Sequence, residues 1–295
     1  MEWQERSIAI DDGQLAYYEA GDGPAVIFLS GGPGDDHQYL RPLAEPLTDI
    51  CRCTLLDQRG VGKSILHRKD AETVQLARFL DDLEQVRLHL GLEQLTLVGH
   101  SWGATYGLLY AAAFPHRVER LALVGLGPIN DEMAAVAHAN VLRPLSSEDL
   151  ERRRILRQKR DEAVARGDRE ASLVIDYELL EMNSRSSFYS RGAAAASLAE
   201  MRASGSGPDR TIAPLLWPSV TEALSRLPER LPQVTGKVMA LYGYQDFEPI
   251  TQAYVLREWM PQTGICLLNE CGHVPWREQP ERFYAAMRQF LGTEA

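Results

Sequence analysis

Residues 99–103, GHSWG, fit the pattern G-x-S-x-G, in which a serine stands between two glycines. An apolar segment precedes Ser101 and a helical pattern follows it, so the serine lies on the turn from a strand to a helix. Such a turn exposes the hydroxyl above the sheet, and its small neighbours let the two backbones approach each other. The free N–H groups at the start of the helix can stabilise an oxyanion. The pattern therefore predicts that Ser101 is a catalytic nucleophile.

A serine hydroxyl needs a general base to take its proton, and a carboxylate orients that base. On this kind of turn, the acid and then the histidine follow the serine in the chain, each after a late strand. Asp246 follows the strand-like segment VMALYG, and His273 follows ICLLN. Both should lie at the carboxyl edge of the sheet, where open α/β sheets bind ligands. Ser101, Asp246 and His273 are the predicted triad, and Glu248 and Asp57 are the alternative acids.

The other histidines fit the role of base less well. His100, directly before the serine, is expected to pack beneath the turn. Five more lie in predicted helices or loops, away from strand ends, and are expected at the surface: His37, His67, His89, His116 and His138.

A second donor to the oxyanion should come from a loop after an early strand. SGGPG at residues 30–34 follows the apolar segment AVIFL and has the flexible backbone that this role needs. The N–H groups of Gly32 and Trp102 are the predicted oxyanion hole, and Gly31 is a candidate substrate contact. The loop matches neither G-x-x-x-x-G-K-[ST] nor G-x-G-x-x-G, which argues against phosphate binding.

Short apolar segments alternate with longer helical patterns along the chain, which is typical of a mostly parallel sheet covered by helices on both faces. The segment 74–90 has amphipathic helical spacing and ends at Gly91. Two strands around Asp12-Gly13 predict an N-terminal antiparallel hairpin. The strand-like segments are residues 25–30, 53–57, 95–99, 121–125, 238–243 and 265–269.

This alternation stops after about residue 128 and returns after residue 231. The sequence between is first charged and helical, then alanine-rich, then rich in glycine and serine. We expect an α/β core formed by residues 1–128 and 232–295, with residues 129–231 inserted as a helical cap. This segment is called the helical insertion below.

Composition and net charge argue against several kinds of partner and cofactor. The net charge of −10 and a pI near 5.3 disfavour nucleic acid and anionic membranes as partners. No apolar run reaches the roughly 18 residues of a membrane span, and no signal peptide is recognisable, so a cytoplasmic location is expected. The four cysteines, Cys51, Cys53, Cys266 and Cys271, are read as reduced thiols in or near strands. No metal or organic cofactor is expected, because the serine mechanism needs none.

Several segments resemble the α/β-hydrolase family of proline iminopeptidases and related aminopeptidases. They are SGGPG at 30–34, LLDQRGVGKS at 55–64 and residues 99–125, together with Asp246 and GH at 272–273. The pair GGPG and DQRGxGxS is more specific than the serine turn alone, because most esterases lack it. The resemblance implies the same triad and oxyanion hole, and cleavage of an N-terminal residue, often proline, from a short peptide or amide.

Members of this family hold the substrate's amino group with carboxylates, since an ammonium in a partly dry pocket needs charged acceptors. The candidates are Glu178 and Glu181 in the helical insertion and Glu248 beside the acid. The sequence departs from the family at two places. Ser30 stands where relatives commonly have histidine, and no carboxylate directly follows Asp246.

Two functions follow from the same triad. The first is a serine aminopeptidase acting on short peptides. The second is a carboxylesterase, lactonase or amidase with an apolar pocket lined by aromatic residues such as Trp102, Trp217, Phe247 and Trp276.

Overall fold

The computed structural model of the protein describes residues 2–292. Within this range an eight-stranded sheet forms the centre, in the order β1-β2-β4-β3-β5-β6-β7-β8. β1 pairs antiparallel with β2 and β2 with β4, whereas the other neighbours are parallel. The predicted α/β-hydrolase fold with its N-terminal hairpin is therefore confirmed. The strands are β1 (Gln4–Ile10), β2 (Gly13–Ala20), β3 (Ala25–Leu29), β4 (Arg52–Leu56), β5 (Leu95–His100), β6 (Val118–Val124), β7 (Lys237–Gly243) and β8 (Thr263–Leu268).

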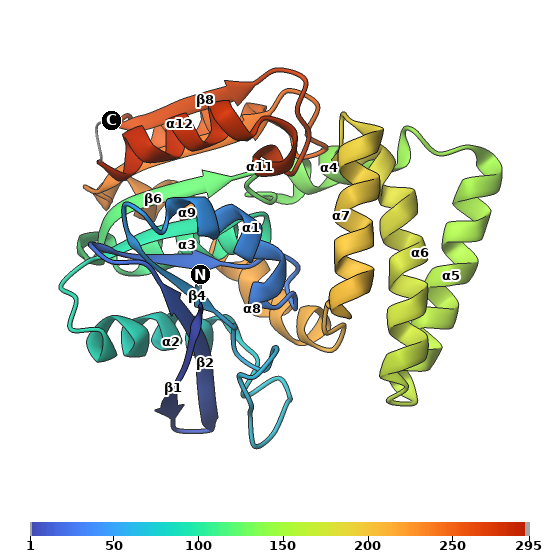
Figure 1. The fold of residues 1–295 in the computed structure, drawn as a ribbon, viewed down its shortest axis with the longest axis horizontal. Helices are drawn as coiled ribbons and strands as arrows, with labels where there is room; N and C mark the ends of the chain where they lie inside the picture. The colour runs from blue at the N-terminus through green and yellow to red at the C-terminus, as the bar shows by residue number, and fades with distance from the viewer. Residues whose placement is uncertain (1, 293–295) are drawn as a thin grey trace.

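Helices cover both faces of the sheet (Figure 1). The helix predicted over residues 74–90 is α2, and its end is followed by Gly91 at φ +67°, a conformation that glycine adopts without strain. The α-helices are α1 (Arg41–Ala44), α2 (Leu76–His89), α3 (Trp102–Ala113), α4 (Asp131–Leu142), α5 (Ser147–Ala165), α6 (Arg169–Ser187), α7 (Arg191–Ser204), α8 (Ile212–Leu224), α9 (Leu227–Arg230), α10 (Thr251–Trp259), α11 (Pro275–Glu278) and α12 (Pro280–Leu291).

The central strands are apolar on both faces because each face has its own core. Ile27 and Leu29 of β3 belong to the core formed with α2 and α3. Val26 and Phe28, which alternate with them, belong to the opposite core with α1 and α12. This alternation follows from the two-residue period of a strand, and it explains why the strands read as continuous apolar segments.

The helical insertion leaves the sheet after β6 and returns at β7. Its helices α5, α6 and α7 lie side by side at the right of Figure 1, beyond the edge toward which the arrowheads of β6 and β8 point. The last part of the insertion packs differently, because Ile212, Leu216 and Val220 of α8 are fully buried in the core that contains α2 and α3. Only its earlier helices therefore stand away from the sheet.

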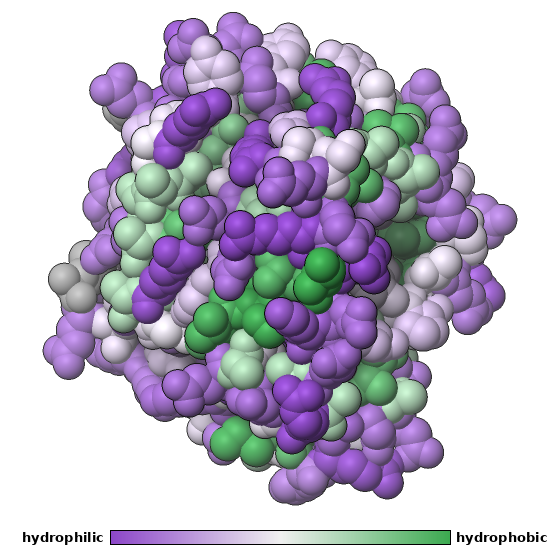
Figure 2. All heavy atoms as spheres, turned by 90° about the vertical axis from the view of Figure 1, so that its right-hand side faces the viewer, coloured by the Kyte–Doolittle hydropathy of each residue, from purple (hydrophilic) through white to green (hydrophobic). Residues whose placement is uncertain are grey.

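The outer face of the insertion is mostly hydrophilic, with an apolar patch near its centre (Figure 2). Exposed apolar side chains on its helices include Val136, Leu150, Ile155 and Val174. Among residues 2–292, none of the helices combines the length and apolar character that crossing a bilayer would require.

Candidate active site

Ser101 occupies a strained turn between β5 and α3. Its backbone angles are φ 55° and ψ −121°, a combination that residues with a side chain rarely adopt. The flanking glycines are required by close backbone packing. A Cβ on Gly99 would lie 2.3 Å from the oxygen of Gly103, and a Cβ on Gly103 would lie 2.1 Å from the oxygen of Leu29. The turn thus packs closely against the end of β3, and this contact fixes Ser101 at the carboxyl edge of the sheet.

His273 and Asp246 meet at the same edge. Nδ1 of His273 lies 2.9 Å from Oδ1 and 3.1 Å from Oδ2 of Asp246. Since a carboxylate only accepts, Nδ1 carries the proton and Nε2 is left unprotonated as a base. The Asp246 side chain is 1% exposed. Gly125, just after β6, makes room for the pair, because a Cβ there would lie 2.9 Å from Nδ1 of His273.

The glycine loop lies against Ser101. A Cβ on Gly31 would lie 3.3 Å from Cβ of Ser101, so the loop touches the serine turn directly. Gly32 has φ +109° and is exposed. Trp102 is the first residue of α3, where a backbone N–H has no partner within the helix. In the described part of the chain, no acceptor takes the N–H of Gly32 or of Trp102.

Gln58 joins the glycine loop to the residue after the serine. Its Nε2 donates to the backbone oxygen of Ser30 at 2.7 Å and to Oγ of Ser30 at 3.0 Å, while its Oε1 accepts from Nε1 of Trp102 at 2.8 Å. Oγ of Ser30 donates to the backbone oxygen of Asp35 at 2.7 Å. A serine and a glutamine thus fix the backbone of the glycine loop.

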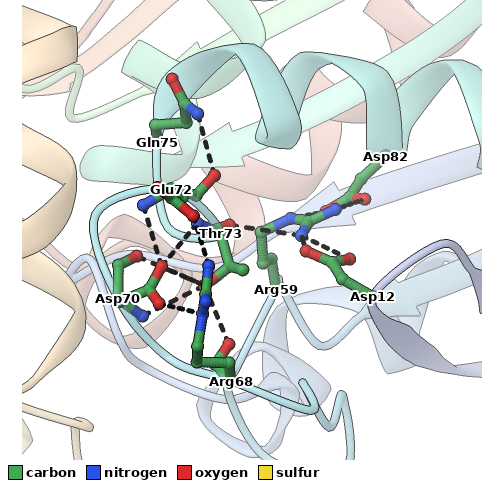
Figure 3. Close-up of polar contacts among 8 residues, drawn as sticks. All are labelled: Asp12, Arg59, Arg68, Asp70, Glu72, Thr73, Gln75 and Asp82. Atoms are coloured by element: carbon green, nitrogen blue, oxygen red, sulfur yellow. Dashed lines mark hydrogen bonds and ion pairs between the residues drawn. The ribbon is translucent and has the colours of Figure 1, made fainter.

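Arg59, next to Gln58, anchors this segment in the core (Figure 3). Its side chain is 3% exposed and lies between two carboxylates. Nε and Nη2 donate to Asp82 at 2.9 and 2.6 Å, and Nη1 donates to Asp12 at 2.7 Å. Nη1 also donates to the backbone oxygen of Thr73, which ties the loop before α2 to the same group. The DQRG segment is therefore a structural support for the loop that carries Gln58.

His100 connects the glycine loop to the histidine loop. Nε2 lies 2.8 Å from the backbone oxygen of His273, and Nδ1 lies 3.2 Å from the hydroxyl of Tyr39, which accepts from the N–H of Gly31. Because the carbonyl oxygen only accepts, Nε2 carries the proton and Nδ1 accepts from Tyr39. Burial, with the adjacent His273, holds the pKa of His100 well below its ordinary value. His100 is thus neutral and packs beneath the turn.

The helical insertion is hydrogen-bonded to the glycine loop and to the loop that carries His273. The N–H of His273 donates to the backbone oxygen of Ser187 at 2.7 Å, and the N–H of Asp209 donates to that of Gly34 at 2.8 Å. The carboxylate of Glu278 bridges the first contact. It accepts from the N–H of Gly272 at 2.6 Å and from the N–H of Ser190 at 2.7 Å.

The three glutamates considered for the substrate amine lie apart. Glu248 is 5% exposed beside Asp246, and its N–H donates to Oδ1 of Asp246 at 2.9 Å. Burial, with the charge of Asp246, raises the pKa of Glu248 well above its ordinary value. Glu178 and Glu181 are not brought to this pair. Nη2 of Arg152 lies 2.9 Å from Oε2 of Glu178, and Nη2 of Arg202 lies 2.9 Å from Oε2 of Glu181. Both glutamates line a separate cavity of the insertion.

Asp57, the alternative acid, lies in a different network. It is fully buried, and its Oδ1 is 2.8 Å from Nδ1 of His37 and accepts from the N–H of the same residue at 2.9 Å. His37, expected at the surface, is 8% exposed and stacks on Tyr18. The prediction failed because the partner of His37 is 20 residues away in the chain.

The four aromatic residues proposed for an apolar pocket do not form one wall. Trp102 and Trp276 are buried in the two opposite cores. Trp217 contacts Trp102 edge-on, with ring centroids 5.6 Å apart, and is 36% exposed. Phe247 alone packs against the predicted base, with its ring centroid 4.4 Å from that of His273.

The cysteines carry no disulfide. Sγ of Cys51 lies 3.6 Å from Sγ of Cys53, and both thiols are buried in the core with α1 and α12. Within residues 2–292, no group of three histidine, cysteine or acidic side chains is arranged to hold a metal ion.

Comparison with known proteins agrees with this architecture. A probable proline iminopeptidase from Streptomyces coelicolor is 35% identical over 129 residues, 40% of this chain and 38% of that protein. A proline iminopeptidase from Neisseria gonorrhoeae is 39% identical over 118 residues, 38% of this chain and 36% of that protein. The chain thus aligns with less than two-fifths of the length of these relatives.

Solved structures match over nearly the whole chain. A proline iminopeptidase-related protein from Thermus thermophilus has a TM-score of 0.75 at 22% identity, covering 99% of this chain and 98% of its own. A thermophilic esterase from Thermogutta terrifontis has a TM-score of 0.69 at 21% identity, covering 98% of each chain. The alpha/beta hydrolase fold family matches residues 24–275. With its serine turn, histidine–aspartate pair and sheet order, the chain belongs to the alpha/beta hydrolase fold family.

Proposed function

We propose that this protein is a serine hydrolase that removes the N-terminal residue from short peptides or amino-acid amides. The observation that carries the proposal is the His273–Asp246 pair, 2.9 Å apart, at the sheet edge that also carries the strained turn of Ser101. A serine at a strand-to-helix turn and a histidine oriented by a carboxylate at the same sheet edge are the groups that nucleophilic catalysis needs. The relatives named proline iminopeptidase support the choice of substrate.

In this mechanism Nε2 of His273 takes the proton of the Ser101 hydroxyl while Oγ attacks the scissile carbonyl carbon. The N–H groups of Gly32 and Trp102 stabilise the negative charge on the carbonyl oxygen. His273 then gives its proton to the departing amine, which leaves an acyl-enzyme on Ser101. Water, activated by the same base, hydrolyses the ester bond and releases the N-terminal residue. Asp246 stabilises the positive charge on His273 throughout.

Hydrolysis of prolyl- and alanyl-naphthylamide, with N-acetylated counterparts and Ser101→Ala as the blank, tests the proposal. Cleavage that requires both Ser101 and a free amino group is expected. Equal cleavage of the N-acetylated compounds would exclude an aminopeptidase.

A carboxylesterase is the second candidate. It is favoured by the ring of Phe247 against His273, which gives the base an apolar neighbour suited to an uncharged acyl group. Turnover of p-nitrophenyl esters without any cleavage of naphthylamides would identify it.

A further inference from the structure

A cavity of about 420 Å³ lies between the core and the helical insertion. His100 and His273 line it on the core side, and Leu180, Phe188 and Met201 of the insertion line the other side. Because His273 is the predicted base, this cavity reaches the predicted triad at its core side. A substrate bound by the insertion would therefore have its reacting carbonyl close to this end.

Asp35, directly after the glycine loop, also lines this cavity. Within residues 2–292 no side chain forms an ion pair or hydrogen bond with the Asp35 carboxylate. The nearby guanidinium of Arg210 is engaged elsewhere, because its Nη2 lies 2.8 Å from Oδ1 of Asp176. Arg41 and Arg277 line the cavity as well, but Arg277 is paired with Glu200. Asp35 therefore presents a free carboxylate to a bound ligand.

Burial raises the pKa of Asp35 to about 6, with Arg210 opposing the shift and Asp36 and Asp176 adding to it. Asp35 is thus largely ionised at pH 7. The pKa of Glu248 is also raised, because its carboxyl is buried beside the charge of Asp246.

The position of Asp35 makes its charge matter for the reaction. A Cβ on Gly32 would lie 3.4 Å from Oδ2 of Asp35, so the carboxylate flanks the residue whose N–H is proposed to stabilise the oxyanion. A negative charge there opposes the negative charge that develops on the carbonyl oxygen. A cation between the two would remove this opposition, and the α-ammonium of a free N-terminus is attached to the carbon next to the scissile carbonyl.

We propose that Asp35 binds the α-ammonium of the substrate and thereby selects substrates with a free amino group. This inference rests on the proposed serine hydrolase and names the residue that recognises its substrate. Of the three glutamates first considered, Glu178 and Glu181 are paired with arginines, and Glu248 lines a different cavity. Asp35 is the carboxylate that remains free and faces the cavity.

The test compares two substrates that differ by the ammonium alone, alanine ethyl ester and ethyl propionate. Because both are esters, the comparison does not depend on whether the enzyme cleaves amides. The wild-type enzyme should prefer the alanine ester. Asp35→Asn should lower kcat/KM for the alanine ester about 10- to 100-fold, since a charge-assisted contact is lost, and should leave ethyl propionate unchanged or faster. Asp35→Glu should restore part of the preference.

Asp22→Asn is the control, because Asp22 is exposed on the turn before β3 and its removal changes the net charge equally. An equal fall for both esters would assign Asp35 a structural role, and an unchanged preference would also overturn the inference. A wild-type enzyme that shows the ester preference yet cleaves no naphthylamide would instead contradict the aminopeptidase alone.

Measurements of substrate affinity test the same inference without turnover. In the Ser101→Ala background, alanyl-p-nitroanilide should bind more tightly than propionyl-p-nitroanilide, and Asp35→Asn should abolish the difference. Equal affinities in the Ser101→Ala protein would overturn the inference even if no ester were hydrolysed.

Discussion

His100 donates a hydrogen bond through Nε2 to the backbone oxygen of His273, over 2.8 Å. The residue before the predicted nucleophile thus holds the main chain of the predicted base. Through Tyr39 the same imidazole reaches the N–H of Gly31. Three loops that are far apart in the sequence are fixed relative to one another by one neutral ring.

His100→Phe keeps the ring and removes both hydrogen bonds. At pH 7.5 the variant should lose about 1–3 kcal/mol of unfolding free energy, because two buried polar groups lose a partner. The folded-state pKa of His100 is depressed, so below about pH 6.5 the unfolded chain binds a proton that the folded protein does not. Wild-type stability should therefore fall relative to the variant by about 1.4 kcal/mol per pH unit. Urea unfolding at pH 7.5, 6.5 and 5.5 measures this, and parallel pH curves would contradict it.

The backbone strain at Ser101 should be measurable as a difference in unfolding free energy between two variants. Ser101→Gly and Ser101→Ala both remove the hydroxyl, but glycine adopts φ 55° and ψ −121° more readily than alanine. We expect the glycine variant to be more stable by about 1 kcal/mol. Glycine relieves the backbone strain of the folded state, and the greater conformational entropy of glycine in the unfolded chain offsets part of this gain. Chemical denaturation of the two inactive proteins provides the comparison. An alanine variant that is equally stable would show that the turn stores no strain.

Substitution by alanine should change the stability of the protein in opposite directions at two helical glycines. Gly103→Ala places a Cβ 2.1 Å from the backbone oxygen of Leu29, which cannot move without displacing β3. A loss of about 4 kcal/mol or more, or failure to fold, is expected. Gly192→Ala in α7 meets only Oγ of Ser190, at 3.7 Å, and should gain up to about 1 kcal/mol. The two variants are compared by their soluble yield and by thermal unfolding. Similar melting temperatures would refute the steric argument.

Glu278→Gln should loosen the histidine loop. The amide keeps one acceptor for the two N–H groups of Gly272 and Ser190, so one charge-assisted bond worth about 1.5–3 kcal/mol is lost. We expect kcat to fall about 10-fold with KM little changed, together with faster amide hydrogen exchange at Gly272 and Ser190. Glu281→Gln on the exposed side of α12 is the matched control. If KM rises and kcat is kept, Glu278 acts on substrate binding instead.

The preference for a cationic substrate should depend on pH in both directions. The quantity to measure is the ratio of kcat/KM for alanine ethyl ester to that for ethyl propionate, because effects of pH that are common to both esters cancel. Below about pH 6 Asp35 gains a proton and the ratio should fall. Above about pH 8 the substrate amine loses its proton and the ratio should fall again. In Asp35→Asn the acid limb should disappear, and its persistence would show that Asp35 does not cause it.

The sequence could predict that Ser101, Asp246 and His273 lie at one sheet edge, because their positions follow from topology. The serine turn needs glycines whatever the rest of the chain does, and parallel strands bring Asp246 and His273 to one edge. The strand predictions had the same basis. The segment 121–125 was recognised although β6 begins at Val118, because a strand covered by two cores is apolar throughout.

The supporting residues could not be found in this way. Asp35 stands in a loop where a pair of aspartates is typical of a solvated turn, and only the fold shows that α6 and α7 close a cavity over it. The sequence of the helical insertion does not show which side of α6 faces the core, so it could not exclude Glu178 and Glu181 as contacts of the substrate amine. Gln58 and Glu278 act through backbone groups of distant loops, so no local pattern marks them. The feature of the sequence that points to Gln58 is its place beside Arg59 in the DQRG segment.

The contacts of Ser187 with His273 and of Asp209 with Gly34 join main chain to main chain. A bond of this kind makes no demand on side-chain identity, so mutations can accumulate across the insertion without detaching it from the catalytic loops. The walls contributed by α6 and α7 are therefore free to diverge while the chemistry beneath stays in place. Substrate range can evolve in this scaffold by changing the side chains of the insertion alone.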